Sequence, residues 1–235
     1  MSEAIAQFGL ERKLDNWQRP NASYKALKQL TRERNQLIAE RTLIKNQLHA
    51  ELTEAQRNES SIQRFKERLA LLDQQEEAIK QEISAYIVKD EKLKVEVENI
   101  SSIPGVGSLT AVTILAETNG FEFIRNKKQL VSYAGLDIKE KTSGTSVKSK
   151  ARISKRGNES LRKAMYFPAL TAIKYNDFFK AVFIRLGSKS SIKMKGAVAV
   201  QRKILELSWI LYKNKTTFEV DYHKNRAEQT EVEAL

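Results

Sequence analysis

An 83-residue stretch between Pro20 and Pro104 contains neither a proline nor a glycine. These two residues disfavour a helix interior more than any others, by about 3 and about 1 kcal/mol relative to alanine. A stretch of this length without them is therefore predicted to be helical almost throughout. We predict an all-α fold in which this long helical element precedes a set of shorter helices.

Apolar residues in the second half of the stretch alternate at spacings of three and four, the pattern of a heptad seam. Glu76 and Asp90 interrupt this seam, whose apolar members are Ile62, Phe65, Leu69, Leu72, Ile79, Ile83, Tyr86 and Leu93. The first half keeps the spacing less regularly, because Arg34 and Arg41 fall on a seam otherwise made by Leu27, Leu30, Leu37, Ile44 and Leu48.

A polar patch at residues 57–61 separates the two halves, and Ser60 or Ser61 is the predicted N-cap of the second helix. We therefore expect a long antiparallel coiled-coil hairpin over residues 22–99. The seam must be buried within the pair or against another chain. Two interpretations stay open: a coiled coil that assembles a homo-oligomer, and an internal spacer.

From residue 100 onward, short apolar segments alternate with glycine-bearing turns. We expect residues 100–222 to form a compact helical domain and residues 223–235 a disordered tail. Residues 135–150 have the Ser, Thr, Gly and Lys content of an exposed loop. The predicted helices of this domain are two joined by a tight turn over 100–117, and single helices over 126–134, 158–174 and 195–213.

The net charge of +12 lies entirely in the second half of the chain, because residues 1–100 hold 17 basic and 17 acidic side chains. Residues 139–163 alone hold nine basic residues against two acidic ones. A field of this kind binds phosphate strongly, so the expected partner is a nucleic acid, and DNA in particular.

Composition also excludes several kinds of site. Without cysteine there is no disulfide, thiolate metal site or cysteine nucleophile. His49 and His223 are isolated, and no metal site is predicted. No segment approaches the roughly 18 apolar residues of a membrane span, and no signal-peptide core is found. We expect a cytoplasmic, nucleoid-associated protein with no membrane partner.

Residues 104–107 read Pro-Gly-Val-Gly between two apolar segments. Gly105 and Gly107 allow a tight turn and leave backbone N–H groups near Ser108 open to phosphate oxygens. The pattern resembles the helix-hairpin-helix element of DNA-handling proteins. It is also compatible with a purely structural connection between helices.

A second candidate for phosphate binding follows the predicted loop. Asn158 can cap a helix that begins at Glu159 and presents basic side chains in its first turns. The predicted phosphate contacts are Lys148, Lys150, Arg152, Lys155, Arg156, Arg162 and Lys163. The competing interpretation is a solvated basic face without a ligand.

Ser143 lies within this basic region, between Thr142 and Gly144. A serine hydroxyl is a weak nucleophile that needs help, and neighbouring cations can supply it when the target is a phosphodiester. Spacing alone does not select this residue, because Ser146, Ser149 and Ser154 compete with it.

From Ile100 to about Tyr222 the chain resembles the C-terminal domain of one group of insertion-sequence transposases. This is the IS110 group of bridge-RNA-guided recombinases, which join a RuvC-like DEDD nuclease domain to a coiled coil and a serine-bearing domain. The matching landmarks, in order, are residues 102–107, 130, 133–136, 142–144, 153–158, 161–162 and 197–205.

The resemblance implies DNA strand exchange at a composite site. In such a site the DEDD carboxylates bind Mg²⁺, and a serine attacks DNA to form a phosphoserine link. By position that serine is Ser143. The resemblance also implies that the coiled coil assembles protomers and that a structured bridge RNA selects the DNA.

The sequence departs from the group at its start, where residues 1–21 resemble a linker that follows the nuclease domain. Glu3, Glu11 and Asp15 do not replace four converging carboxylates, so no cofactor is assigned to this chain and Mg²⁺ belongs to the nuclease domain. A truncated gene product, an isolated domain and a subunit completed in trans all stay open. We expect a DNA-binding transposase that is not active without the DEDD domain. The alternative is a non-catalytic nucleic-acid-binding and dimerisation module.

Overall fold

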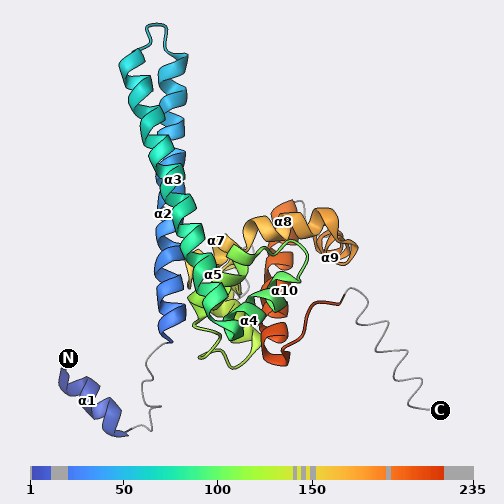
Figure 1. Ribbon diagram of the computed structural model, residues 1–235. Coiled ribbons are helices and arrows are strands. Elements are labelled where there is room, and N and C mark those ends of the chain that lie inside the picture. The colour runs from blue at the N-terminus through green and yellow to red at the C-terminus, as the bar shows by residue number, and fades with distance from the viewer. Residues whose placement is uncertain are drawn as a thin grey trace.

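The computed structural model describes residues 2–11, 21–139, 142–143, 147–148, 152–188 and 192–219, with the backbone alone for 142–143 and 147–148. The predicted all-α class is confirmed: apart from four two-residue strands, the described elements are helices. A rod of two helices, α2 and α3, projects from a globular domain formed by α4 to α10 (Figure 1). The predicted tail at 223–235 lies outside the described residues.

The rod is the predicted antiparallel hairpin, made by α2 (Ala22–Thr53) and α3 (Glu59–Lys89). The predicted cap is wrong, because Asn58 caps α3 by accepting a hydrogen bond from the Ser61 N–H at 3.1 Å. Asparagine is as good a cap as serine, and here it lies one helical turn before the first buried seam residue, Ile62. A separate helix, α1 (Ser2–Glu11), has no buried residue.

The charged residues on the seam pair with one another inside the rod. Glu76 of α3 is buried and accepts from Arg34 at 2.9 Å and from Arg41 at 2.5 Å. Arg41 also bonds Asp73 at 2.8 Å. Three of the four charged seam positions, Arg34, Arg41 and Glu76, therefore meet, which ties the register of α2 to that of α3.

Asp90 ends the straight path of the rod. It caps α4 (Glu91–Ser101) by accepting a hydrogen bond from the Leu93 N–H at 3.1 Å. Leu93, the last residue of the predicted seam, therefore belongs to α4 and not to α3, and it is buried in the hydrophobic core. The predicted helix, tight turn and helix follow, with α5 (Ser108–Thr118) after the turn. Nucleic-acid binding by this element stays a prediction.

The globular core gathers around α10 (Lys193–Asn214), which contacts α4, α6, α8 and α9. Its buried stripe repeats at helical spacing and consists of Gly196, Ala197, Val200, Gln201, Ile204, Leu205, Ser208 and Leu211. The single helix predicted over 158–174 is two helices, α7 (Glu159–Ala164) and α8 (Tyr166–Tyr175), which meet at Met165. Helix α6 (Lys127–Tyr133) was predicted, whereas α9 (Asp177–Gly187) was not.

The prediction of a loop over 135–150 is wrong at the six residues that form paired strands, whereas the other described residues, 135–137, belong to no helix or strand. Strand β1 (Ile138–Lys139) pairs antiparallel with β4 (Arg152–Ile153). Farther out, β2 (Thr142–Ser143) pairs with β3 (Val147–Lys148). The β-branched residues of these strands favour extended structure, but the Ser, Thr, Gly and Lys residues between them are typical of loops and led to the prediction of a loop. We call residues 138–153 the serine arm.

Candidate active site and nucleic-acid interface

The serine arm carries Ser143 at its outer end. In the antiparallel register Ser143 lies opposite Val147, so three residues connect the two strands. Thr142 lies opposite Lys148, and nearer the domain Lys139 lies opposite Arg152. The sequence predicts Ser143 in a flexible, cationic loop, and the structure places its backbone in a short strand instead. Lys150 lies outside the described residues.

Hydrogen bonds hold the base of the arm. The Ser154 N–H donates to the Asp137 carbonyl at 2.8 Å, and the Ser154 hydroxyl donates to the Asp137 carboxylate at 2.5 Å. The Lys155 N–H donates to the Gly135 carbonyl at 3.1 Å. Ser154, one of the serines that competed with Ser143 in the sequence, therefore has a structural partner.

The chain leaving the arm packs tightly on the end of α6. Gly157 has φ +142°, and a Cβ at this position would lie 2.3 Å from the Tyr133 carbonyl oxygen, so no other residue fits without movement. The next residue, Asn158, donates its N–H to the same carbonyl at 2.7 Å. Its side-chain oxygen accepts from the Leu161 N–H at 2.9 Å, which confirms the predicted cap of α7.

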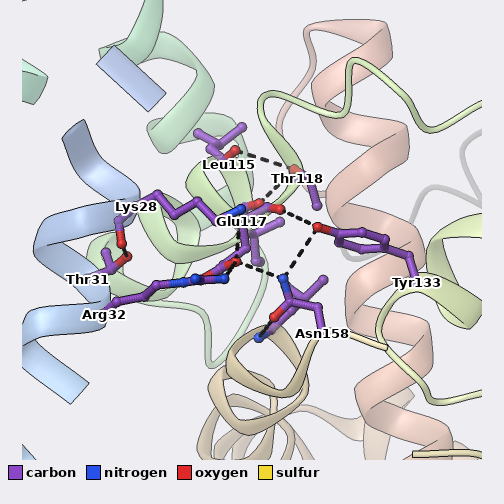
Figure 2. A network of polar contacts seen from close by, with 10 residues as sticks. Lys28, Thr31, Arg32, Leu115, Glu117, Thr118, Tyr133 and Asn158 are labelled. Atoms are coloured by element: carbon purple, nitrogen blue, oxygen red, sulfur yellow. Dashed lines mark hydrogen bonds and ion pairs between the residues drawn. The ribbon is translucent and has the colours of Figure 1, made fainter. Parts of the chain in front are cut away.

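Asn158 also joins a buried polar cluster around Glu117 (Figure 2). The Glu117 carboxylate accepts from Arg32 at 2.8 and 3.0 Å, from Asn158 at 2.7 Å, and lies 3.5 Å from Lys28. The Tyr133 hydroxyl donates to the Glu117 carbonyl at 2.9 Å. One carboxylate thus connects the rod (α2) to the globular domain (α5) and to the cap of α7.

Glu117 is ionised in this cluster. Its side chain is 0% exposed, and burial alone raises the pKa of a carboxyl, but hydrogen bonds from Arg32 and Asn158 and the Lys28 charge outweigh burial and lower the pKa of Glu117. Sequence inspection missed this residue. A single acidic side chain at the end of the apolar run of α5 gives no local signal, since its partners lie 85 and 41 residues away.

A cleft of about 740 Å³ opens beside the cluster, between α2 and the start of α7. Its lining includes Arg32, Asn35 and Gln36 from the rod and Asn158 and Lys163 from the domain. The cleft has a cation on each side, Arg32 and Lys163, which pair with Glu117 and Glu159, and Glu159 also lines the cleft.

The predicted phosphate contacts fall into two groups. Arg152, Lys155 and Arg156 are exposed at the base of the arm and form no ion pair with a described acidic residue. Arg162 instead donates to the Ala134 carbonyl at 2.9 Å, where it holds the end of α6. Lys163 is exposed and pairs with Glu159 at 2.9 Å.

The residues predicted to bind phosphate at the Pro-Gly-Val-Gly turn also differ in their surroundings. Gly105 has φ +88°, and a Cβ there would lie 2.5 Å from the Pro168 carbonyl oxygen, so this glycine is required by packing against α8. Gly107 and Ser108 are exposed at the start of α5, where no side chain caps the helix. Phosphate binding by Gly107 and Ser108 stays a prediction.

The described part of the chain offers no set of three His, Asp or Glu residues that could hold a metal ion. No helix within it is long and apolar enough to cross a membrane. The chemistry that the described site can supply is thus a hydroxyl on a projecting arm together with cations that neutralise phosphate.

Comparison with known protein families agrees with this organisation. A model of the transposase IS116/IS110/IS902 family matches residues 97–183, which include the serine arm. A DEDD transposase model for IS110 matches residues 2–56, which include α1 and α2. The helical domain and its arm are those of an insertion-sequence transposase. The chain belongs to the IS110 family.

Individual relatives extend over most of the chain. It is 26% identical to the pilin gene-inverting proteins of Moraxella lacunata and Moraxella bovis over 227 residues, 94% of this chain and 67% of each relative. It is 27% identical to the transposase for insertion sequence element IS1111A of Coxiella burnetii over 130 residues, 54% of this chain and 35% of that protein. The chain therefore spans about two thirds of the length of the pilin gene-inverting proteins.

Proposed function

We propose that this protein performs DNA strand exchange, with Ser143 as the nucleophile on the serine arm. The supporting observation is the position of Ser143 at the outer end of a basic arm whose base is held by hydrogen bonds between Ser154 and Asp137. The Ser143 hydroxyl oxygen bonds to a DNA phosphorus, and the bond from that phosphorus to a deoxyribose oxygen breaks. The leaving oxygen keeps the bonding electrons and takes up a proton, while the protein keeps a phosphoserine link.

Cations of the arm and of the residues that follow it assist this step by neutralising the charge that develops on the phosphate. Lys148, Lys150, Arg152, Lys155 and Arg156 are proposed for this role. The DEDD family implies a divalent metal, which would supply Lewis-acid chemistry when bound by the nuclease carboxylates. The described residues contain no cluster of His, Asp or Glu that could hold a metal ion, so no metal ligand is assigned among them.

Assembly through the rod and guidance by a bridge RNA belong to the same proposal. Leu43 and Leu71 are 58% and 53% exposed on the rod, which supports a contact with a second protomer. The bridge RNA is supported by the family resemblance and by the segregated positive charge.

The test is adduct formation by the chain with Mg²⁺, guide RNA and labelled donor DNA, in parallel reactions with and without a separately added DEDD domain. We expect a covalent protein–DNA band on a denaturing gel for the native sequence and for Ser146→Ala, a matched change in the same arm. The band should be absent for Ser143→Ala. Its persistence in Ser143→Ala would rule out the assigned nucleophile.

The second candidate is a non-catalytic nucleic-acid-binding and dimerisation module, which the segregated charge favours independently of any chemistry. Both candidates predict DNA affinity that falls steeply with salt. The module predicts tight binding without an adduct for every variant, including the native sequence.

A further inference from the structure

A second basic surface lies away from the serine arm, in a groove of about 560 Å³ between α9 and α10. Its floor is apolar and includes Phe178, Val182 and Leu186 on α9. The small residues Ala181 and Ala199 face it from the two helices, which leaves room for a flat ligand.

The rim of the groove is mainly cationic. Arg185, Arg202 and Lys203 line it, with Glu206 as its acidic residue. None of the three cations forms an ion pair with a described carboxylate. Unpaired cations around an apolar floor indicate a ligand that is itself an anion with apolar faces.

Phe178 gives the groove an aromatic surface. Phe178 is 37% exposed, whereas its neighbour Phe179 is buried. The Lys203 ammonium lies 5.9 Å from the ring centroid, and the edge of the ring is fixed by a T-shaped contact with buried Phe179 at 5.2 Å. The Phe178 ring can stack on a base, and the neighbouring Lys203 can bind the phosphate of the same nucleotide.

We propose that this groove binds an unpaired segment of DNA, with one base stacked on Phe178 and the adjoining phosphates on Arg185, Arg202 and Lys203. The inference rests on the proposed function, because strand exchange separates DNA strands and leaves unpaired nucleotides to be held. Duplex DNA does not fit in the same way, since its bases are stacked on one another and cannot reach the ring.

The experiment measures binding of fluorescein-labelled dT20 to the full chain by anisotropy, in a series of salt concentrations. Phe178→Leu keeps an apolar side chain and removes the stacking ring, and we expect it to weaken dT20 binding about 5- to 100-fold. Arg202→Gln should weaken binding and lower the salt slope by about 0.7 for the lost phosphate contact. Binding of a 20-base-pair duplex should change less than twofold in Phe178→Leu.

Phe167→Leu and Lys180→Gln are the matched controls, since both change exposed residues outside the groove and should leave dT20 binding unaltered. Circular dichroism melts check that each variant is folded. Ser143→Ala should bind dT20 like the native sequence, so failure of the proposed nucleophile leaves this test intact. Conversely, normal adduct formation with unchanged dT20 binding in Phe178→Leu would overturn the groove assignment alone.

Other occupants of the groove give different results. Equal loss of dT20 and duplex binding in Phe178→Leu would overturn base stacking. Tighter binding of rU20 than of dT20, with the same loss in Phe178→Leu, would reassign the groove to RNA and overturn the DNA assignment. A changed sedimentation coefficient with unchanged dT20 affinity would identify a contact between copies of the chain and would also overturn it.

Discussion

Replacing Glu117 by Gln should destabilise the junction between the rod and the globular domain. Glutamine has nearly the same shape, but its amide places an N–H₂ group where a carboxylate oxygen now accepts from Arg32 or Asn158. Each charge-assisted hydrogen bond contributes about 1.5–3 kcal/mol. Arg32 is 52% exposed and regains water when released, so the lower end of this range applies to it. We expect the free energy of unfolding to fall by about 3 kcal/mol.

A double-mutant cycle tests the physical origin of this loss. Arg32→Gln should cost about 2 kcal/mol, because it leaves a buried carboxylate with fewer partners. The double variant should be no less stable than Glu117→Gln, since Arg32 has no buried partner once the charge is removed. Lys28→Gln is the matched control and should lower the free energy of unfolding by less than about 1 kcal/mol. The Lys28 ammonium lies 3.5 Å from the Glu117 carboxylate, and its side chain is 35% exposed.

The assay is urea denaturation followed by circular dichroism, repeated as a function of pH. Because its partners lower the pKa of Glu117 in the folded state, its contribution is present above the ordinary carboxyl range and is lost as pH falls through the lowered pKa. The native sequence and Glu117→Gln should therefore converge in stability at low pH. A difference below about 0.5 kcal/mol at pH 7, or strictly additive losses in the cycle, would refute the role given to this carboxylate.

Two further predictions concern Gly105 and Glu96. Gly105→Ala should lower the free energy of unfolding by about 2–4 kcal/mol, because it combines a left-handed backbone with a Cβ 2.5 Å from a carbonyl oxygen. Gly107→Ala is the control and should be nearly neutral in the same urea assay, because a Cβ there would have nothing within 4 Å. Equal losses of stability in the two variants would contradict this explanation. Burial raises the pKa of Glu96 in the folded state despite its hydrogen bond from Tyr24, so stability is lost as pH rises from the ordinary carboxyl pKa to the raised pKa. Glu96→Gln should therefore gain stability relative to the native sequence between acidic and neutral pH, and thermal melts across this range that stay parallel would exclude the explanation.

Most of the architecture could be predicted from local patterns. The absence of proline and glycine between residues 21 and 103 fixed the long helices, and the polar patch near Asn58 located the turn of the hairpin. The cap at Asn158 was predicted because asparagine before an acidic, apolar segment is a local signal that needs no distant partner. Helix α9 was missed because its apolar residues follow α8 after a break of one residue.

The serine arm was missed for a related reason. Its strands are two residues long, too short for an alternating pattern to be recognised, and they exist because their partners across the ribbon are present. Ser143 was selected as the candidate nucleophile because of its charged surroundings and the family resemblance. Its place at the outer end of a paired ribbon required the register of the four strands.

The sequence by itself determined the helical class, the hairpin and the segregation of positive charge, because helix propensity, capping and net charge depend on neighbours in the chain. Only the tertiary structure decided how individual polar residues are used. It paired Glu76 with Arg34 and Arg41, and it placed Arg162 on α6 instead of toward solvent. It also buried Glu117 between elements up to 85 residues apart. Such partners are brought together by packing, and spacing along the chain carries no information about them.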